Sequence, residues 1–252
     1  MDPLYYVPPI FFGIAFLFSM LGMGGSQLYI PILYWSGMDF KTEAVPLGIL
    51  LNIVNSGSAA IIYGRKKLIN WSVALPFAVT MVIFAPLGVW LNVQLPVKPL
   101  LTFFALFTAA AAVLMLSGWK PKSGTMTPKK RVTLGLTTGS GLGLITGMIG
   151  RGGGSFIVPL LYIVGLDARA AAATSALVVT ASGISSFLSH LASAAKPQWA
   201  IWLATVGAVF LGSQLGSRLM ASKLKSRAVK QVFGWVLLGV AILILVKDVL
   251  LS

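Results

Sequence analysis

The sequence predicts an all-α polytopic membrane protein built from two inverted-topology repeats. Of the 252 residues, 57% are hydrophobic and only 10% are charged, with a mean hydropathy of +0.92. Apolar runs close to the length of a membrane-spanning helix recur along the whole chain. The second half of the chain also repeats the first at a constant offset of 128 residues, as Gly22 and Gly150 illustrate.

The repeat rests on residue types that seldom match by chance. The matched pairs are Gly24 and Gly152, Gly25 and Gly153, Pro31 and Pro159, Tyr34 and Tyr162, Asp39 and Asp167, Trp71 and Trp199, and Gly88 and Gly216. We therefore expect a first repeat at residues 1–117, a basic cytoplasmic linker at 118–131 and a second repeat at 132–252.

Each repeat contains five apolar segments. The first has Leu4–Leu21, Ser26–Trp35, Thr42–Tyr63, Trp71–Asn92 and Pro99–Ser117, and the second has Val132–Ile149, Ser155–Val164, Arg169–Leu191, Pro197–Met220 and Ala228–Val246. The second segment of each repeat is too short to cross a bilayer, since ten residues of helix extend only about 15 Å and the core is about 30 Å thick. We expect a half-helix there, after a Gly-rich break; whether the first two segments cross twice or re-enter is left open.

The loop charges predict the orientation of the repeats. In the first repeat, Arg65, Lys66 and Lys67 follow the third segment, whereas the matching loop of the second repeat has only Lys196. In the loop after the fourth segment the reverse holds, because the second repeat has more basic residues there than the first. The positive-inside rule then places matching loops on opposite sides and both termini outside a bacterial inner membrane. The same rule explains the net charge of +14, so we expect lipid contacts and no nucleic-acid partner.

The Gly-rich breaks are the candidate substrate site. They are Gly22-Met23-Gly24-Gly25-Ser26-Gln27 and Gly150-Arg151-Gly152-Gly153-Gly154-Ser155. Arg151 is the sole Asp, Glu, Lys or Arg between Arg131 and Asp167, and a cation at membrane depth points to function. Two helix N-termini, capped by Ser26 or Gln27 and by Ser155, would present N–H groups to an anion near the midplane. The alternatives are glycines that only permit helix packing, and an Arg151 that snorkels to a membrane face.

Polar residues of the third segments would complete the site. Asn52 and Asn55 lie on one helix face, and the matching segment carries Thr174 and Ser175. Hydrogen bonding between helices is the competing role for these side chains. His190, which is the only histidine, is interpreted as a structural residue at the outer membrane interface.

The paired motifs GMGGSQLYIP and GRGGGSFIVP resemble the TauE/SafE family, also called the toluene sulfonate uptake permeases, over essentially the entire chain. The resemblance implies a secondary transporter that moves a sulfur-containing oxyanion, such as sulfite or an organosulfonate, by alternating access. The predicted substrate-binding residues are Arg151, Gly152, Gly153, Ser155, Gly24, Gly25, Ser26, Gln27, Asn52, Asn55, Thr174 and Ser175. An anion channel, or a permease for another small organic anion, is the alternative within transport.

An enzyme is not expected, because the chain has no Cys, one His and no carboxylate inside a span. No cofactor or metal is predicted either. The exact substrate, the direction of transport, the coupling ion and the oligomeric state are left open.

Overall fold

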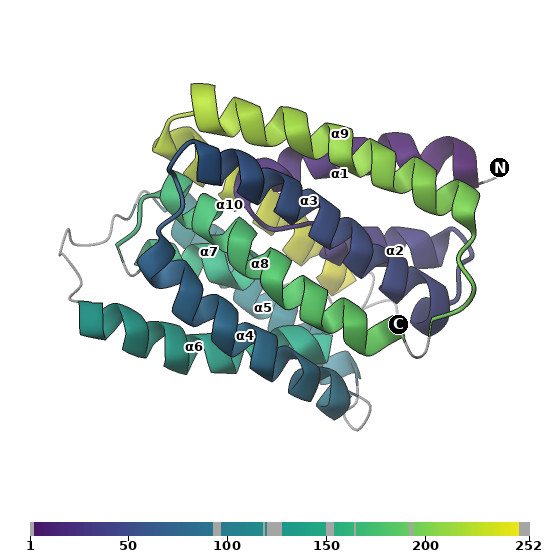
Figure 1. The fold of residues 1–252 in the computed structure, drawn as a ribbon, viewed down its shortest axis with the longest axis horizontal. Helices are drawn as coiled ribbons and strands as arrows, with labels where there is room; N and C mark the ends of the chain where they lie inside the picture. Colours follow the sequence, from purple (N-terminus) through teal and green to yellow (C-terminus); the bar gives the residue numbers. More distant parts are fainter. Residues whose placement is uncertain are drawn as a thin grey trace.

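In a computed structural model of the chain, the described residues are 3–92, 97–117, 119, 128–149, 154–163, 165–191 and 194–246. They form helices joined by short loops (Figure 1). The first half contains α1 (Pro3–Leu21), α2 (Ser26–Trp35), the π-helix η1 (Phe40–Ala44), α3 (Val45–Arg65), α4 (Trp71–Asn92) and α5 (Val97–Leu116). The second half contains α6 (Pro128–Ile149), α7 (Gly154–Ile163), α8 (Ala168–Leu191), α9 (Trp199–Lys223) and α10 (Ser226–Ile244).

The predicted all-helical class is confirmed, and both short segments are helices of ten residues, α2 and α7. Their bounds differ by the same 128 residues that relate the two sequence motifs. Most helices begin within two residues of the expected segment starts; the largest difference is at α6, which begins at Pro128 and not Val132. The rest of the expected linker, apart from Trp119, lies outside the described residues.

Among the described residues, six helices are long and apolar enough to cross a membrane. They are Leu4–Leu21, Phe40–Arg65, Trp71–Leu91, Ala168–Leu191, Trp199–Lys223 and Ser226–Leu243. Large apolar side chains are exposed along their outer faces, for example Ile83 on α4 and Leu203 on α9. Such surfaces are unfavourable in water and suit contact with lipid tails.

The two halves interlock and do not form separate domains. The first helix of each half lies along the fourth helix of the other half: α1 along α9, and α6 along α4 (Figure 1). The third helices, α3 and α8, pack against each other near the centre, and so do the fifth helices, α5 and α10.

Glycine permits the close approach of α6 to α4. Gly135, Gly139, Gly143 and Gly147 recur every fourth residue and so form a stripe along one face of α6. A Cβ atom added at Gly147 would lie only 2.1 Å from the Ala85 carbonyl oxygen. On the other pair, a Cβ at Gly216 of α9 would lie 2.0 Å from the Phe16 carbonyl oxygen of α1. Both helix pairs therefore pack backbone against backbone.

Loop contacts define two ends of the molecule. At the η1 end, residues 36–44 meet residues 194–198, where the Ala195 N–H donates to the Thr42 carbonyl oxygen at 2.9 Å. At the basic end, residues 65–70 meet the start of α8, where the Asn70 N–H donates to Thr174 Oγ1 at 3.0 Å. Because α3 runs from the η1 end to the basic end and α8 runs back, these matching helices are antiparallel (Figure 1).

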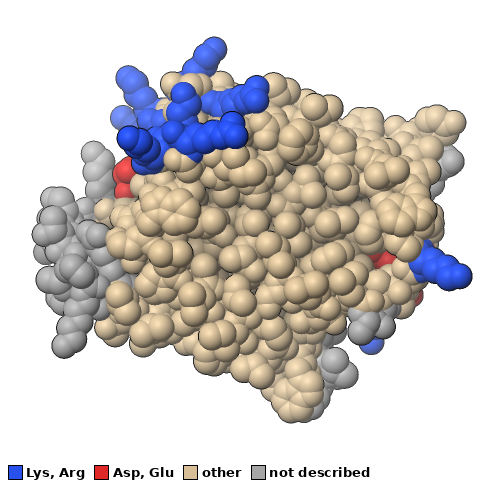
Figure 2. All heavy atoms as spheres, viewed as in Figure 1, with Lys and Arg blue, Asp and Glu red and all other residues tan. Residues whose placement is uncertain are grey.

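Lysine and arginine gather at the basic end (Figure 2). The exposed cations of the loops and helix ends there are Arg65, Lys66, Lys67, Arg218, Lys223, Lys225 and Arg227. At the η1 end, the described part of the chain exposes Lys41 and Lys196.

Candidate functional site

The first Gly-rich break turns the chain sharply between α1 and α2. Gly24 and Gly25 adopt φ angles of 84° and 114°, which side-chain-bearing residues rarely adopt. Gly25 is the N-cap of α2, and Ser26 is its first helical residue. The expectation that Ser26 or Gln27 caps this helix is therefore wrong: the left-handed turn needed at the cap position selects glycine, which has no side chain to accept a hydrogen bond.

Asn52 of α3 provides the missing cap. Its Oδ1 accepts a hydrogen bond from the Ser26 backbone N–H at 3.2 Å. A Cβ at Gly24 would lie 2.0 Å from the same oxygen, so glycine is required for Asn52 to reach the helix end. Asn52 thus joins α3 to the N-terminus of the half-helix.

Asn55 holds the preceding turn. Its Nδ2 donates to the Gly24 carbonyl oxygen and, at 3.2 Å, to the hydroxyl of Tyr29. Its side chain is fully buried, and its Oδ1 has no hydrogen-bond partner among the described residues. Ser26 Oγ also has no hydrogen-bond partner among the described residues, and Ser26 is only 1% exposed. A buried polar atom without a partner costs roughly 1–3 kcal/mol, so water or a ligand is the expected partner of each.

Gln27 and Ser155 join the two half-helices. Ser155 Oγ donates to Gln27 Oε1 at 2.5 Å, and both side chains are buried beside Met23. Positions 27 and 155 are related by the offset of 128 residues that relates the repeats. The first turns of α2 and α7 consequently meet at the centre of the molecule.

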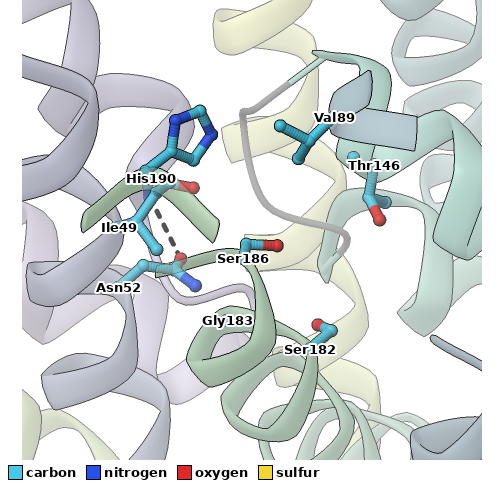
Figure 3. A pocket seen from close by; sticks show the side chains of 10 residues that line it. Ile49, Asn52, Val89, Thr146, Ser182, Gly183, Ser186 and His190 are labelled. Atoms are coloured by element: carbon cyan, nitrogen blue, oxygen red, sulfur yellow. Dashed lines mark hydrogen bonds between the residues drawn. The ribbon is translucent and has the colours of Figure 1, made fainter. Parts of the chain in front are cut away.

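A small pocket lies beside the N-terminus of α2 (Figure 3). Its cavity volume is about 30 Å³, and its lining residues are Ser26, Ile49, Asn52, Val89, Thr146, Gly147, Ser182, Gly183, Ser186 and His190. In Figure 3, Asn52 and His190 face Thr146 and Val89 across the opening, with Ser186 between them. The pocket lies toward the η1 end, where α3 begins and α8 ends.

Among the described residues, the pocket lining combines hydroxyl, amide and imidazole groups and includes no Asp, Glu, Lys or Arg. The partial positive charge of the α2 N-terminus faces this pocket through Ser26. Thr146 and Ser182 donate their hydroxyl hydrogens to carbonyl oxygens of their own helices, at 3.1 and 3.3 Å. Ser26 Oγ, which has no partner among the described residues, is by contrast able to donate to a ligand.

The structure brings some of the predicted site residues together and not others. Ser26 and Asn52 line the pocket. Gly24, Gly25, Gln27, Asn55 and Ser155 do not line it but lie at, or hydrogen bond to, the starts of the half-helices. Thr174 and Ser175 lie outside the lining: Thr174 accepts from the α3–α4 loop, and Ser175 Oγ donates to the Gly22 carbonyl oxygen at 2.9 Å. Arg151, Gly152 and Gly153 lie outside the described residues.

Four lining residues that bear polar side chains are absent from the predicted substrate-binding set: Thr146, Ser182, Ser186 and His190. Three of them recur at every fourth position of α8, so a search for a polar stripe on that helix would have found them. The interpretation of His190 as an interfacial residue alone is incomplete, because its side chain also lines the pocket. Within the described residues there is no cluster of three or more His, Cys, Asp or Glu that would suit a metal ion.

Comparison with known proteins agrees with this architecture. Residues 8–244 match the family model described as sulfite exporter TauE/SafE. The chain belongs to the TauE/SafE family. No solved structure matches it.

Three bacterial relatives cover most of this TauE/SafE chain. A probable membrane transporter protein of Xylella fastidiosa (strain Temecula1) is 29% identical over 92% of the chain and 91% of its own length. The probable membrane transporter protein ORF9 of a Sinorhizobium species is 28% identical over 83% and 80%. The probable membrane transporter protein YfcA of Escherichia coli K12 is 27% identical over 88% and 85%. With six candidate spans among the described residues, the protein is a multi-pass membrane transporter for a small substrate.

Proposed function

We propose that this TauE/SafE protein is a secondary transporter of a sulfur-containing oxyanion across the bacterial inner membrane, by alternating access between its two repeats. The observation that carries the proposal is the pocket at the α2 N-terminus. Uncharged polar groups line it, a helix N-terminus faces it, and Ser26 Oγ is buried there with no partner among the described residues. Helix N-termini bind anions through their N–H groups and dipole.

The size of the cavity favours a compact anion. A volume of about 30 Å³ suits two or three water-sized groups, at roughly 10–15 Å³ each. Sulfite, which has one sulfur and three oxygen atoms, needs less widening of this pocket than an organosulfonate. Sulfite is therefore the preferred substrate, and a sulfonate is the second choice.

Arg151 completes the proposed site by supplying a full positive charge. Thr146 and Gly147 line the pocket close to the end of α6, and Arg151 follows them in the sequence before α7 begins. A guanidinium offers a planar fork of donors that suits an oxyanion. The uncharged lining seen here needs such a group to bind an anion with useful affinity.

Opposite orientation of the two repeats supports the proposed topology. The matching helices α3 and α8 are antiparallel, and most exposed cations lie at the basic end (Figure 2). By the positive-inside rule we assign the basic end to the cytoplasm, where its cations also attract anionic lipid headgroups, and both termini to the outside. Single-cysteine labelling should find Lys66, Lys122 and Lys225 inside and Lys98 and Lys196 outside. Labelling of Lys66 and Lys196 from one side would contradict this topology.

Transport in proteoliposomes tests the substrate. Vesicles containing the purified protein should take up sulfite with saturable kinetics, and preloaded sulfite should accelerate exchange. Sulfate, thiosulfate and methanesulfonate serve as competitors. Uptake equal to that of protein-free vesicles for every one of these anions would reject the proposal.

Counterflow separates a carrier from an anion channel, which is the alternative. A carrier exchanges internal for external substrate, whereas a channel equilibrates it without acceleration. The proposal also assigns no chemical step to the protein, so the anion should emerge unchanged, as anion chromatography of the vesicle contents would show.

A further inference from the structure

When each helix is replaced by its counterpart in the other half, the main helix pairs that are in contact stay the same. Exchange converts the pair α1 and α9 into α6 and α4, and it converts α3 and α9 into α8 and α4; all of these pairs are in contact. Gln27 and Ser155, which occupy matching positions, are hydrogen bonded to each other. An exchange of this kind is a rotation about an axis that relates the two halves. Residues at matching positions can contact each other only close to that axis, so the axis passes between the first turns of α2 and α7.

The pocket breaks this symmetry, because it lies on one side of the axis only. Exchange of the halves converts its lining residues Ser186, Asn52 and Gly183 into Ser58, Thr180 and Asn55. It converts Ser26 and Ser182 into Gly154 and Val54. It converts His190 into Ile62 and Thr146 into Phe18. The counterpart region therefore lies toward the basic end, where α3 ends and α8 begins.

The counterpart region is closed in this structure. Phe18 is 2% exposed and Ile62 is 9% exposed, where the observed pocket has Thr146 and His190. The Tyr63 hydroxyl donates to the Ser19 carbonyl oxygen at 2.6 Å, and Gln214 Nε2 donates to Ser58 Oγ at 2.8 Å. These contacts join α1, α3 and α9 on that side.

The closed region nevertheless contains several polar side chains. Asn55, Ser58, Thr180 and Ser217 are polar, and three of them are fully or almost fully buried. Burial of polar groups is costly unless they are hydrogen bonded, and Asn55 Oδ1 has no partner among the described residues. Water or a protonated oxyanion would supply the donor that this oxygen lacks.

We infer that the protein forms a second pocket, the counterpart of the first, which is lined by Asn55, Ser58 and Thr180, opens toward the basic end, and takes the same oxyanion. The inference rests on the proposed transport function. Phe18 and Ile62 are the side chains that withdraw when this pocket opens, and the first pocket closes at the same time. The substrate thereby meets hydroxyl and amide groups on each side of the axis, although the two sets differ.

Single-cysteine accessibility tests the inference, and the native chain needs no prior changes because it contains no cysteine. Ser186→Cys and Ser58→Cys are a matched pair at equivalent positions. In oriented membrane vesicles, a membrane-impermeant maleimide should label Ser186→Cys only from the η1 side and Ser58→Cys only from the basic side. Lys196→Cys and Lys66→Cys mark the two sides, and Ile61→Cys, on the exposed apolar face of α3, should resist the reagent from both.

Two outcomes overturn the inference. One is labelling of Ser58→Cys from the η1 side; the other is no labelling of Ser58→Cys where Lys66→Cys reacts fully. Adding Ile62→Trp to each single-cysteine variant provides a second check, because a larger side chain should abolish labelling of Ser58→Cys and preserve that of Ser186→Cys. Loss of both labels from a protein that stays monodisperse would also count against a separate second pocket.

Sulfite protection separates this inference from the proposed substrate. Sulfite at ten times its dissociation constant should slow labelling of both cysteines roughly tenfold, because the free fraction falls by that factor. If labelling keeps its sidedness and sulfite has no effect, the second pocket stands and the choice of sulfite is wrong.

Discussion

The half-helices α2 and α7 occupy matching positions in the two repeats, but the sequences at their starts carry different side chains. In the first half, Ser26 begins the half-helix and Asn52 caps it. In the second half, the matching residues are Gly154 and Thr180, and Thr180 donates to Ser56 Oγ at 2.9 Å. Where the first break has Met23, the second has Arg151. The repeat thus keeps the positions of the half-helices while its polar and charged groups differ between the halves, so a ligand bound between them would meet unlike groups from each.

The largest expected effect comes from removing the charge that distinguishes the second break. Arg151→Ala should weaken sulfite binding roughly ten- to hundredfold, since a charge-assisted hydrogen bond contributes about 1.5–3 kcal/mol. Isothermal titration or a thermal-shift series measures the affinity. Arg151→Lys should restore only part of it, because lysine lacks the planar fork.

Lys122→Ala is the control for general attraction by a basic protein and should leave the affinity unchanged. Normal binding and transport by Arg151→Ala would show that the difference between the two breaks has no role in anion recognition.

The packing of α6 on α4 offers the next test, since it positions Thr146 at the pocket. Gly147→Ala should lower the free energy of unfolding by about 1–3 kcal/mol, because the new Cβ meets the Ala85 carbonyl oxygen at 2.1 Å. Gly141→Ala, on the same helix with no atom within 4 Å of its Cβ position, is the matched control. Thermal denaturation in detergent compares the two; equal melting temperatures would mean that α6 is not held close to α4.

Asn52→Ala tests the difference between the N-termini of the two half-helices. Loss of the hydrogen bond to the Ser26 N–H should reduce the free energy of unfolding by about 1 kcal/mol, as for other helix caps. It should also weaken sulfite binding, because Asn52 lines the pocket. Thr180→Ala, at the matching position, should weaken binding less, because Thr180 does not line the pocket described here. The opposite ranking of the two variants would assign the ligand to the other half.

The smallest effect concerns Asp39, which precedes η1 and matches Asp167 before α8. Hydrogen bonds from the Thr42 backbone N–H and hydroxyl, at 2.9 and 2.7 Å, lower the pKa of the Asp39 carboxyl group. A lowered pKa in the folded state stabilises the protein above the unfolded pKa, and this stabilisation is lost as the pH falls through the folded pKa. Asp39→Asn should therefore melt slightly below the wild type at neutral pH, with the gap closing in acid. If the difference in melting temperature persists in acid, the Asp39 carboxylate is not its cause.

Much of this architecture follows from the sequence by itself. Hydrophobic length determines which segments can span, and glycine at a break permits the φ angles that end α1 and begin α2. These are local properties of the chain. The offset of 128 residues likewise predicted a second half-helix, α7, at the position where it occurs.

Only the tertiary structure decided which polar side chain does what. Asn52 caps a helix that begins 26 residues earlier, and Ser175 donates to Gly22, 153 residues away. The pocket is assembled from α2, α3, α4, α6 and α8, so Thr146 and His190 join Ser26 through packing alone. Local sequence determines where helices form because their hydrogen bonds close within one turn. The partner of a buried side chain depends on which helices the packing brings together.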